Sequence, residues 1–315
     1  MKKYTYLLAA IVITSSCNSD DVITEELEDH YRAKTETSVA EQTVVFEYTP
    51  APGQFINETK TGGFTGNETT PEAANAYAER RMKEGTFVSL GGFGGYIVVG
   101  FDHSIDNTGS YDFGIIGNSF KGSSEPGVVW VMQDENGNGK PDDSWYELKG
   151  SETGKETIIQ NYSVTYYRPS APQQPVKWTD SEGNSGEVDY LKAFHQQDYY
   201  YPLWIKEDSY TLTGTCLEGR NYDQSGNGTY WVNAEYDWGY TDNFSEIDRL
   251  SNDDNANAGA KANYFKISNA IDTNGNPVNL NYIDFIKVQT GCNTKSGWLG
   301  ENSTEVFGFF DYSMK

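Results

Sequence analysis

Side chains that carry oxygen alternate along one short stretch of the chain. Counting from Asp134 as position 1, they stand at positions 1, 3, 5 and 9; a Gly stands at position 6, and Lys140 offers a backbone carbonyl at position 7. This is the ligand order of a calcium loop, in which alternate side chains of a tightly wound segment point at one ion. The sequence predicts a structural calcium site of modest affinity, because Trp145 replaces the usual Glu at position 12. The predicted ligands are Asp134, Asn136, Asn138, the carbonyl of Lys140, Asp142 and Asp143.

An ordinary turn also fits this stretch. It lies between two apolar runs, Gly127–Met132 and Trp145–Leu148, that have the composition of strands. Its Asn-Gly-Asn-Gly centre supplies the positive φ angles of a β-hairpin tip without any ion. In either case the segment joins two strands. A similar alternation at residues 272–277 is better explained as a hairpin with Asn274-Gly275 at its tip.

Flat polar aromatic residues gather between Tyr190 and Tyr240. Strand propensity and core packing account for many of them. However, the consecutive rings of Tyr199, Tyr200 and Tyr201 must alternate between faces if the chain is extended there, so at least one should face outward. Exposed rings beside Asp, Asn and Gln can stack on a sugar or a corrin-like face. The predicted ligand contacts are Tyr199, Tyr201, Trp204, Trp231 and Trp238, with His195 as a polar contact.

Few residue patterns support catalysis. The chain has three His, of which His30 precedes the predicted domain, so too few remain for a His-rich metal site. No Ser stands in a Gly-x-Ser-x-Gly nucleophile elbow, and the glycines at residues 91–95 lack the Lys-Ser/Thr ending of a phosphate loop. A pair of acids for glycoside hydrolysis can always be drawn from 46 Asp and Glu, so that count decides nothing. An enzymatic function stays open without being favoured.

The first 17 residues have the pattern of an export signal. Lys2 and Lys3 precede an apolar run from Leu7 to Ile13, and small residues lead to Cys17. This resembles a bacterial lipoprotein signal peptide, in which Cys17 is lipidated and becomes the first residue of the mature protein. The alternative is an ordinary cleaved secretion signal, because the apolar run is too short to span a bilayer. Asn18–Asp21 is similar to the acidic export signal of Bacteroidota lipoproteins, which implies display on the outer face of the outer membrane.

A tether and one domain are expected after the signal peptide. Residues 18–41 carry many charges, few apolar residues and no periodicity, which is typical of a flexible acidic linker. Residues 42–315 suffice for one large β domain or two smaller ones. Because neither an internal repeat nor a Pro- or Ser-rich linker marks a boundary, we expect a single domain over 42–315.

Composition restricts the partners and the fold. The net charge is -23 and the pI is near 4.4, so a nucleic-acid backbone would be repelled. The 23 Tyr, 7 Trp and 32 Gly suit many short strands joined by tight turns. Besides Cys17 the chain has Cys216 and Cys292, which can form one disulfide in an oxidising compartment. Two buried free thiols are the alternative, because spacing alone does not show proximity.

Turn residues divide most of the domain into short apolar runs. One helix is predicted, with Thr70 as N-cap, Pro71 in its first turn and Gly85 at its end. The rest alternates as strands and turns. We therefore predict an all-β fold, an antiparallel β-sandwich that is jelly-roll-like, with one packed helix. The apolar stripe that packs the helix on the core is Ala74, Tyr77, Ala78 and Met82.

Three stretches of the chain, residues 88–103, 129–150 and 282–291, resemble a family of Bacteroidota cell-surface lipoproteins. The resemblance covers most of the mature chain. It implies a protein that works with a TonB-dependent outer-membrane receptor, often in loci for corrinoid (vitamin B12) uptake. It implies no catalytic or ligand residues at particular positions.

These observations predict a ligand-capture protein that faces outward from the outer membrane and contacts the membrane through its lipid anchor only. It would concentrate a small molecule for a TonB-dependent transporter, a corrinoid by the resemblance and otherwise a glycan. Two alternatives remain. One is a surface glycoside hydrolase that uses an Asp/Glu pair, and the other is a structural accessory subunit of a receptor complex.

Overall fold

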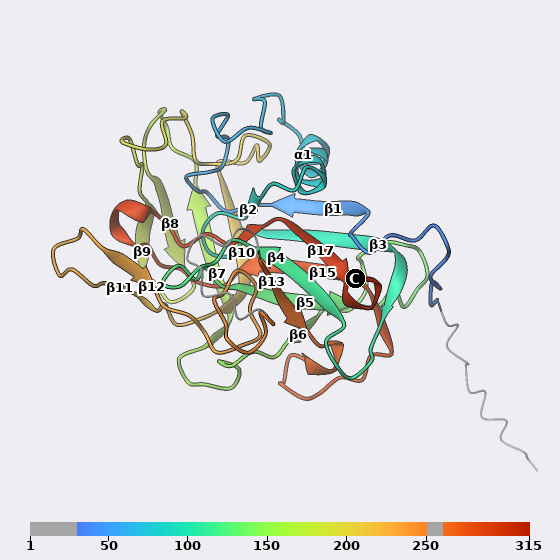
Figure 1. Cartoon of the computed structure of the whole chain (residues 1–315). Helices are drawn as coiled ribbons and strands as arrows, with labels where there is room; N and C mark the ends of the chain where they lie inside the picture. Colours follow the sequence, from blue (N-terminus) through green and yellow to red (C-terminus); the bar gives the residue numbers. More distant parts are fainter. Residues whose placement is uncertain (1–29, 251–260) are drawn as a thin grey trace, which may run out of the picture.

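The computed structural model describes residues 30–250 and 261–315, so the predicted signal peptide and Cys17 lie outside the described residues. Antiparallel strands dominate the described part, with one α-helix, α1 (Pro71–Lys83) (Figure 1). No helix there is both long and apolar enough to cross a membrane. The strands are β1 (Val44–Thr49), β2 (Val88–Ser89), β3 (Tyr96–Asp106), β4 (Phe113–Gly117), β5 (Gly127–Met132), β6 (Tyr146–Leu148), β7 (Ile159–Tyr167), β8 (Val176–Asp180), β9 (Ser185–Val188), β10 (Ser209–Cys216), β11 (Asn221–Asp223), β12 (Trp231–Asn233), β13 (Lys261–Phe265), β14 (Ala270–Ile271), β15 (Tyr282–Thr290), β16 (Glu305–Val306) and β17 (Gly308–Asp311). Three short 3-10 helices, at Ile267–Asn269, Gly297–Leu299 and Tyr312–Met314, complete the elements.

A six-stranded sheet forms the centre of the molecule, in the order β1-β3-β15-β5-β6-β14. Because side chains alternate along a strand, Val99, Val131 and Ile286 share one face of this sheet. That face is buried in one apolar core with Ile115 and Phe309 from the three-stranded sheet β13-β4-β17. Two packed antiparallel sheets with one helix confirm the predicted all-β sandwich.

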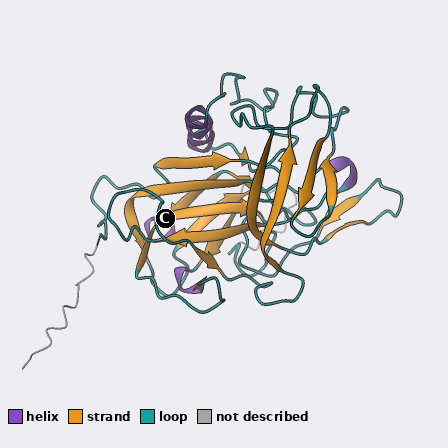
Figure 2. Cartoon of the chain, turned by 180° about the vertical axis from the view of Figure 1, so that it is seen from behind, coloured by secondary structure: helices purple, strands orange, loops and turns teal. Residues whose placement is uncertain are grey.

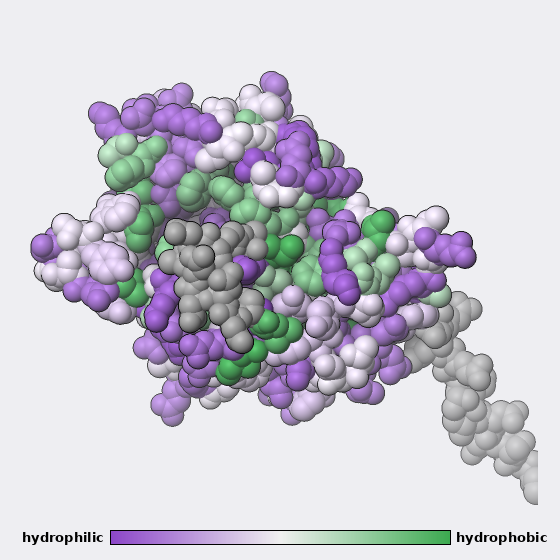
Figure 3. All heavy atoms as spheres, viewed as in Figure 1, coloured by the Kyte–Doolittle hydropathy of each residue, from purple (hydrophilic) through white to green (hydrophobic). Residues whose placement is uncertain are grey.

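A four-stranded sheet, in the order β10-β7-β8-β9, stands beside the sandwich. Figure 2 shows its strands running steeply across the direction of the central sheet. It has a second apolar core, which includes Phe93, Tyr166, Tyr200 and Leu212. Polar residues cover much of the outer loops of the molecule, as the face in Figure 3 shows. The four-stranded sheet thus forms a wall opposite the face of the central sheet that points away from the first apolar core.

Helix α1 packs as its apolar stripe predicts. Thr70 caps it by accepting the backbone N–H of Ala73 at 3.2 Å, and its buried residues include all four members of the predicted stripe. Asn75 also closes the edge of the central sheet. Its Oδ1 accepts the N–H of Tyr48 and its Nδ2 donates to the carbonyl of Phe46, both at 2.8 Å. The helix therefore covers a strand edge that would otherwise be open for pairing.

The described part of the predicted tether does not behave as a tether. Residues 30–41 lie along the domain, where the Arg32 guanidinium pairs with Asp284 at 3.0 Å and Lys34 pairs with Asp311 at 2.9 Å. The backbone N–H of Asp311 also donates to the carbonyl of Ala40 at 2.8 Å. The two basic residues of this stretch, Arg32 and Lys34, are thus neutralised by acids on β15 and β17. The folded domain therefore begins before residue 42, and residues 18–29 lie outside the described residues.

The two remaining cysteines are free and buried in the structure. Cys216 ends β10, and Cys292 follows β15 with its Sγ 3.3 Å from the Tyr236 hydroxyl. Burial raises the pKa of the Cys216 thiol to about 11 and that of Cys292 to about 12. The structure therefore has the alternative of two buried thiols, and the predicted Cys216–Cys292 disulfide is not formed in it.

Candidate functional site

The predicted calcium loop joins β5 to β6 as the tip of a β-hairpin, in which Trp130 pairs with Glu147. Asp134 is only 2% exposed and lies at the base of the loop. Its Oδ1 accepts the backbone N–H of Asn138 at 3.2 Å, and its Oδ2 accepts that of Gly139 at 2.8 Å. Gly139 has a φ of 72°, which a residue with a Cβ rarely adopts. The loop thus winds tightly around the first predicted ligand.

The remaining predicted ligands hydrogen-bond to one another within this loop. The carboxylate of Asp142 accepts from the amide nitrogens of Asn136 and Asn138 at 3.0 and 3.1 Å, and Asp143 accepts from Asn136 at 3.0 Å. Lys140 donates its N–H to Asn138 Oδ1 at 2.8 Å. To turn oxygen toward a cation, the two Asn side chains must rotate. The donor set therefore fits a hard cation after a local rearrangement.

The six predicted aromatic and His contacts do not form one surface. Tyr201 and Trp204 are buried in the two apolar cores, where Tyr201 lies 4.4 Å from the Arg168 guanidinium and Trp204 packs 5.6 Å from the Tyr48 ring. The chain at residues 199–201 forms bends, not a strand, so the expected alternation of ring directions does not apply. The prediction that Tyr201 and Trp204 contact a ligand is therefore wrong.

The other four predicted contacts are half-buried and lie in different places. His195 is held by a 2.8 Å contact between its Nδ1 and Glu58 Oε1. Trp231 on β12 packs its indole against the backbone of Gly297. Trp238 lines a separate hollow of about 300 Å³ with Tyr111 and Tyr264. Tyr199 is also apart, and its carbonyl accepts from Asn57 at 2.9 Å. No single ligand face results from these side chains.

A different set of side chains, three of them charged, does lie together on the face of the central sheet that points away from the first apolar core. Glu47, Val98, Lys287, Trp130 and Glu147 are directly opposite one another on β1, β3, β15, β5 and β6. Residues that face each other across antiparallel strands point to the same side of a sheet. The five side chains therefore form one row, with an acid at each end and a lysine in the middle. We call it the charged row.

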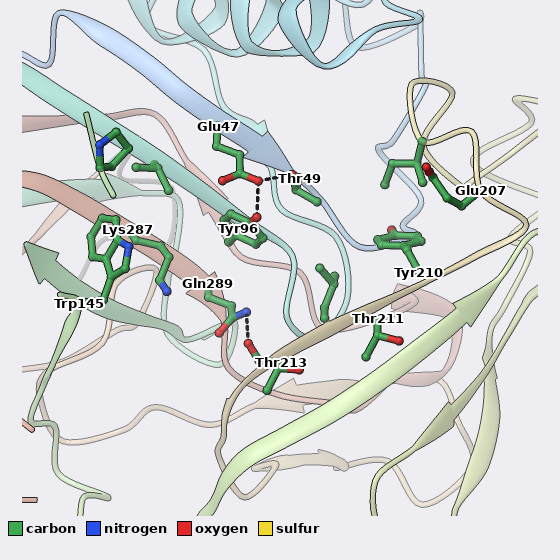
Figure 4. Close-up of a pocket in the computed structure, with 14 residues that line it drawn as sticks. Glu47, Thr49, Tyr96, Trp145, Glu207, Tyr210, Thr211, Thr213, Lys287 and Gln289 are labelled. Atoms are coloured by element: carbon green, nitrogen blue, oxygen red, sulfur yellow. Dashed lines mark hydrogen bonds between the residues drawn. The ribbon is translucent and has the colours of Figure 1, made fainter. Parts of the chain in front are cut away.

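The charged row is the floor of a cleft between the central sheet and β10 of the four-stranded sheet. Two adjoining hollows of about 570 and 620 Å³ share Trp145, Thr213 and Lys287 in their walls. Figure 4 shows Lys287 beside the Trp145 indole, with Thr211 and Thr213 of β10 across from them. Gln289 closes the base by donating to the carbonyls of Gly94 and Thr213 at 2.8 and 3.0 Å. The hollows have the size of a small-molecule site.

Trp145 and Pro141 connect this cleft to the predicted calcium loop. Both residues line the 570 Å³ hollow, and both lie at the end of the loop segment that leads into β6. The indole of Trp145 is 5.1 Å from the Lys287 Nζ, and Trp130 lies 4.6 Å from it. Any change in the conformation of the loop would therefore reach the wall of the cleft.

Lys287 is the electrostatic centre of the cleft. Burial lowers the pKa of its ammonium to about 8, and the charges of Glu47 and Glu147 partly oppose this shift. Two indole faces stabilise the cation through their π electrons. At neutral pH the cleft thus offers a positive charge next to aromatic surface.

The two acids of the charged row are too far apart to form a hydrolytic pair. Burial raises the pKa of Glu147, as expected for a general acid. Its carboxylate accepts a hydrogen bond from the Thr215 hydroxyl. Glu47, however, stands four strands away along the charged row, about 19 Å at the backbone, whereas glycosidases need roughly 5 to 9.5 Å. Asp272, in the second hollow, is held by the backbone of its own turn at Asn274 and Asn276. The charged row alone therefore supplies no pair of acids for hydrolysis.

A separate acidic cluster lies outside the cleft. Glu125, Asp242 and Glu305 bring carboxylate oxygens within 4.8 Å of one another, the only three acidic groups so close among the described residues. Asp242 accepts the backbone N–H groups of Asn118 and Glu305, both at 2.9 Å. Burial and mutual repulsion raise the pKa of Glu125 to about 8, while burial raises the pKa of Asp242 to about 7. The cluster thus retains protons near neutral pH.

Sequence patterns did not identify the cleft, although one signal was present. Lys287 stands between Ile286 and Val288 in β15, a mostly buried strand in which a charge needs a reason. The calcium-loop prediction did locate the hairpin that carries Trp145. Comparison of the sequence with protein-family models gives no match, and neither does comparison with curated proteins.

Proposed function

We propose that this protein captures a small molecule in the cleft above the charged row. The single observation that carries the proposal is the floor itself, where Lys287 lies against two indoles and between two hollows of ligand size. The wall on β10 adds the side chains of Thr211 and Thr213, which suit a polar ligand. The family resemblance favours a corrinoid as the ligand, and the aromatic and hydroxyl lining suits a glycan next.

Calorimetric titration with cyanocobalamin and a panel of oligosaccharides tests this proposal. Trp145→Ala should weaken binding about tenfold, since a stacked aromatic contact typically contributes 1 kcal/mol or more. Trp238→Ala is the matched control, because Trp238 lines the separate 300 Å³ hollow, and it should leave affinity unchanged. Chromatography of the sugars afterwards distinguishes capture from hydrolysis. Shortened sugars would establish the hydrolase, and binding only to a receptor would establish the structural subunit.

We also propose that the protein is a lipoprotein on the outer face of the outer membrane and works beside a TonB-dependent transporter. The support is the signal peptide ending at Cys17, the acidic residues that follow it and the family resemblance. Cys17→Ser should move the protein out of the membrane fraction. Protease added to intact cells should digest the wild-type protein, and complete protection would place it in the periplasm instead.

Calcium completes the proposal as a structural ion in the loop between β5 and β6. The convergence of Asp142 and Asp143 on the two Asn side chains supports it, together with the buried Asp134. The ion would hold the hairpin in the conformation that sets Trp145 against Lys287. Ligand affinity should therefore fall when calcium is removed by a chelator.

A further inference from the structure

Among the described residues, no partner of opposite charge is in direct contact with the ammonium of Lys287. In the part of the chain that the structure describes, it forms no hydrogen bond or ion pair and touches the faces of Trp130 and Trp145 instead. The charged row explains this arrangement. Glu47 and Glu147 are each two strands from Lys287, about 10 Å at the backbone, so neither acid closes on the ammonium.

Several other lysines among the described residues pair with acids. The Nζ atoms of Lys34, Lys155 and Lys295 lie 2.8 to 2.9 Å from carboxylate oxygens, although all three side chains are more exposed to solvent than a core residue. The chain has 46 acidic residues for 23 basic ones, so acidic partners are abundant. Lys287 has no such acidic partner among the described residues, and the faces of two indoles take its place.

The surroundings of Lys287 leave space for an anion to approach. Uncharged side chains, those of Val98, Gln289 and Thr213, line the hollows beside it, and the two acids of the charged row act on its charge without forming an ion pair. Burial disfavours its charged form, and an oxyanion beside the ammonium would restore it. The ammonium and the anion would pair in a site shielded from bulk water. A charge-assisted hydrogen bond is about twice as strong as a neutral one.

We propose that the ligand of this cleft carries an anionic oxygen group, a carboxylate or a phosphate ester, beside a ring, and that Lys287 binds the anion while Trp145 lies against the ring. The 5.1 Å between the ammonium and the Trp145 ring places both contacts on neighbouring parts of one molecule. This inference rests on the proposed function, because it assigns a chemical class to the ligand of the same cleft. Acidic sugars and phosphate-bearing corrinoids share this chemistry.

Two pairs of probes test this inference, and in each pair only one member carries the anion. One pair is an oligogalacturonate and its methyl ester, and the other is cyanocobalamin, which has a phosphodiester, and dicyanocobinamide, which lacks it. The wild-type protein should bind the anionic member of one pair about tenfold more tightly, equivalent to 1.4 kcal/mol. The pair that shows the preference identifies the source of the anion.

Variants at Lys287 assign the preference to this residue. Lys287→Gln should abolish it and Lys287→Arg should keep it, whereas Lys192→Gln, at an exposed lysine, should leave it unchanged. Thermal melting checks that each variant is folded. Equal affinity for both members of each pair, with Trp145→Ala weakening both, would overturn this inference and leave ligand capture intact. If no probe binds, or if Trp145→Ala leaves the affinity of every bound probe unchanged, the proposed function fails as well.

Discussion

One carboxylate oxygen of Asp284 accepts two hydrogen bonds from the Arg32 guanidinium, from Nε at 3.2 Å and from Nη2 at 3.0 Å. The second oxygen accepts the backbone N–H of Asp134 at 2.8 Å. Asp284 is fully buried on β15. One side chain of the central sheet thus holds both the N-terminal segment and the predicted calcium loop.

Replacing Asp284 should destabilise the whole domain. In Asp284→Ala the Arg32 charge and the Asp134 N–H lose their acceptor, so we expect the free energy of unfolding to fall by about 3 kcal/mol. Urea denaturation measures this change, and limited proteolysis should cut residues 30–41 faster. Asp237→Ala, at an exposed acid, should change stability by about 0.5 kcal/mol at most. Equal stability of the Asp284 and Asp237 variants would contradict the role of the Arg32–Asp284 pair.

Calcium should raise the melting temperature of the wild-type protein. The ion adds bonds that only the folded loop can make, and stability rises with ion concentration by mass action. Asp134→Ala should lose most of this shift. Asp272→Ala removes a carboxylate from a turn of similar composition, at residues 272–276, and should keep the shift. A wild-type melting temperature that is indifferent to both calcium and chelator would make the loop an ordinary hairpin turn.

Stability should fall as the pH rises from about 5 to about 8. In the folded state the pKa of Glu125 is raised to about 8 and that of Asp242 to about 7, mainly by burial, whereas both are near 4 when unfolded. The folded protein therefore binds more protons in this window, so the free energy of unfolding decreases with pH, by at most about 1.4 kcal/mol per pH unit for each proton. Glu305→Gln removes a third acid of the cluster, whose pKa is also raised by burial, and should flatten this dependence. A stability that rises with pH across the window would show that the cluster is ionised and paired.

The two buried cysteines should be unreactive until the protein unfolds. Burial raises the pKa of both thiols, so little thiolate is present at neutral pH. Ellman's reagent should detect no rapid thiol in the folded chain and two in denaturant, when Cys17 is replaced by Ser. Finding none in denaturant, and two only after reduction, would mean that Cys216 and Cys292 are bonded in the mature protein.

Local signals in the sequence were sufficient for elements that depend on neighbouring residues. The Thr70 cap and the Pro71 start identified α1, and β5 has the predicted bounds. The hairpin of β8 and β9 was missed, although Val176 and Trp178 stand at alternate positions of β8 and a turn with a Gly follows. Polar residues alternate with the apolar ones because only one face of this short strand pair is packed, and they obscured the apolar pattern.

The cleft depends on pairing between distant strands, which a single sequence does not reveal. Lys287 meets Trp130 only because β15 inserts between β3 and β5. The predicted tether was wrong over residues 30–41 for the same reason, since Arg32 pairs with the distant Asp284. Tyr201 and Trp204 were predicted as ligand contacts because an aromatic-rich sequence does not show which rings lie in a core and which on a surface.

The position of β15 also determines the order in which the protein can assemble. Gln289 of β15 bonds to Gly94, 195 residues earlier in the chain, so the middle of the central sheet closes only after nearly all of the polypeptide is present. Such distant pairing makes folding slow. A chain that stops before Tyr282 keeps β3 and β5 but leaves their apolar edges open, which favours aggregation. The floor of the cleft is thus among the last parts of the molecule to form.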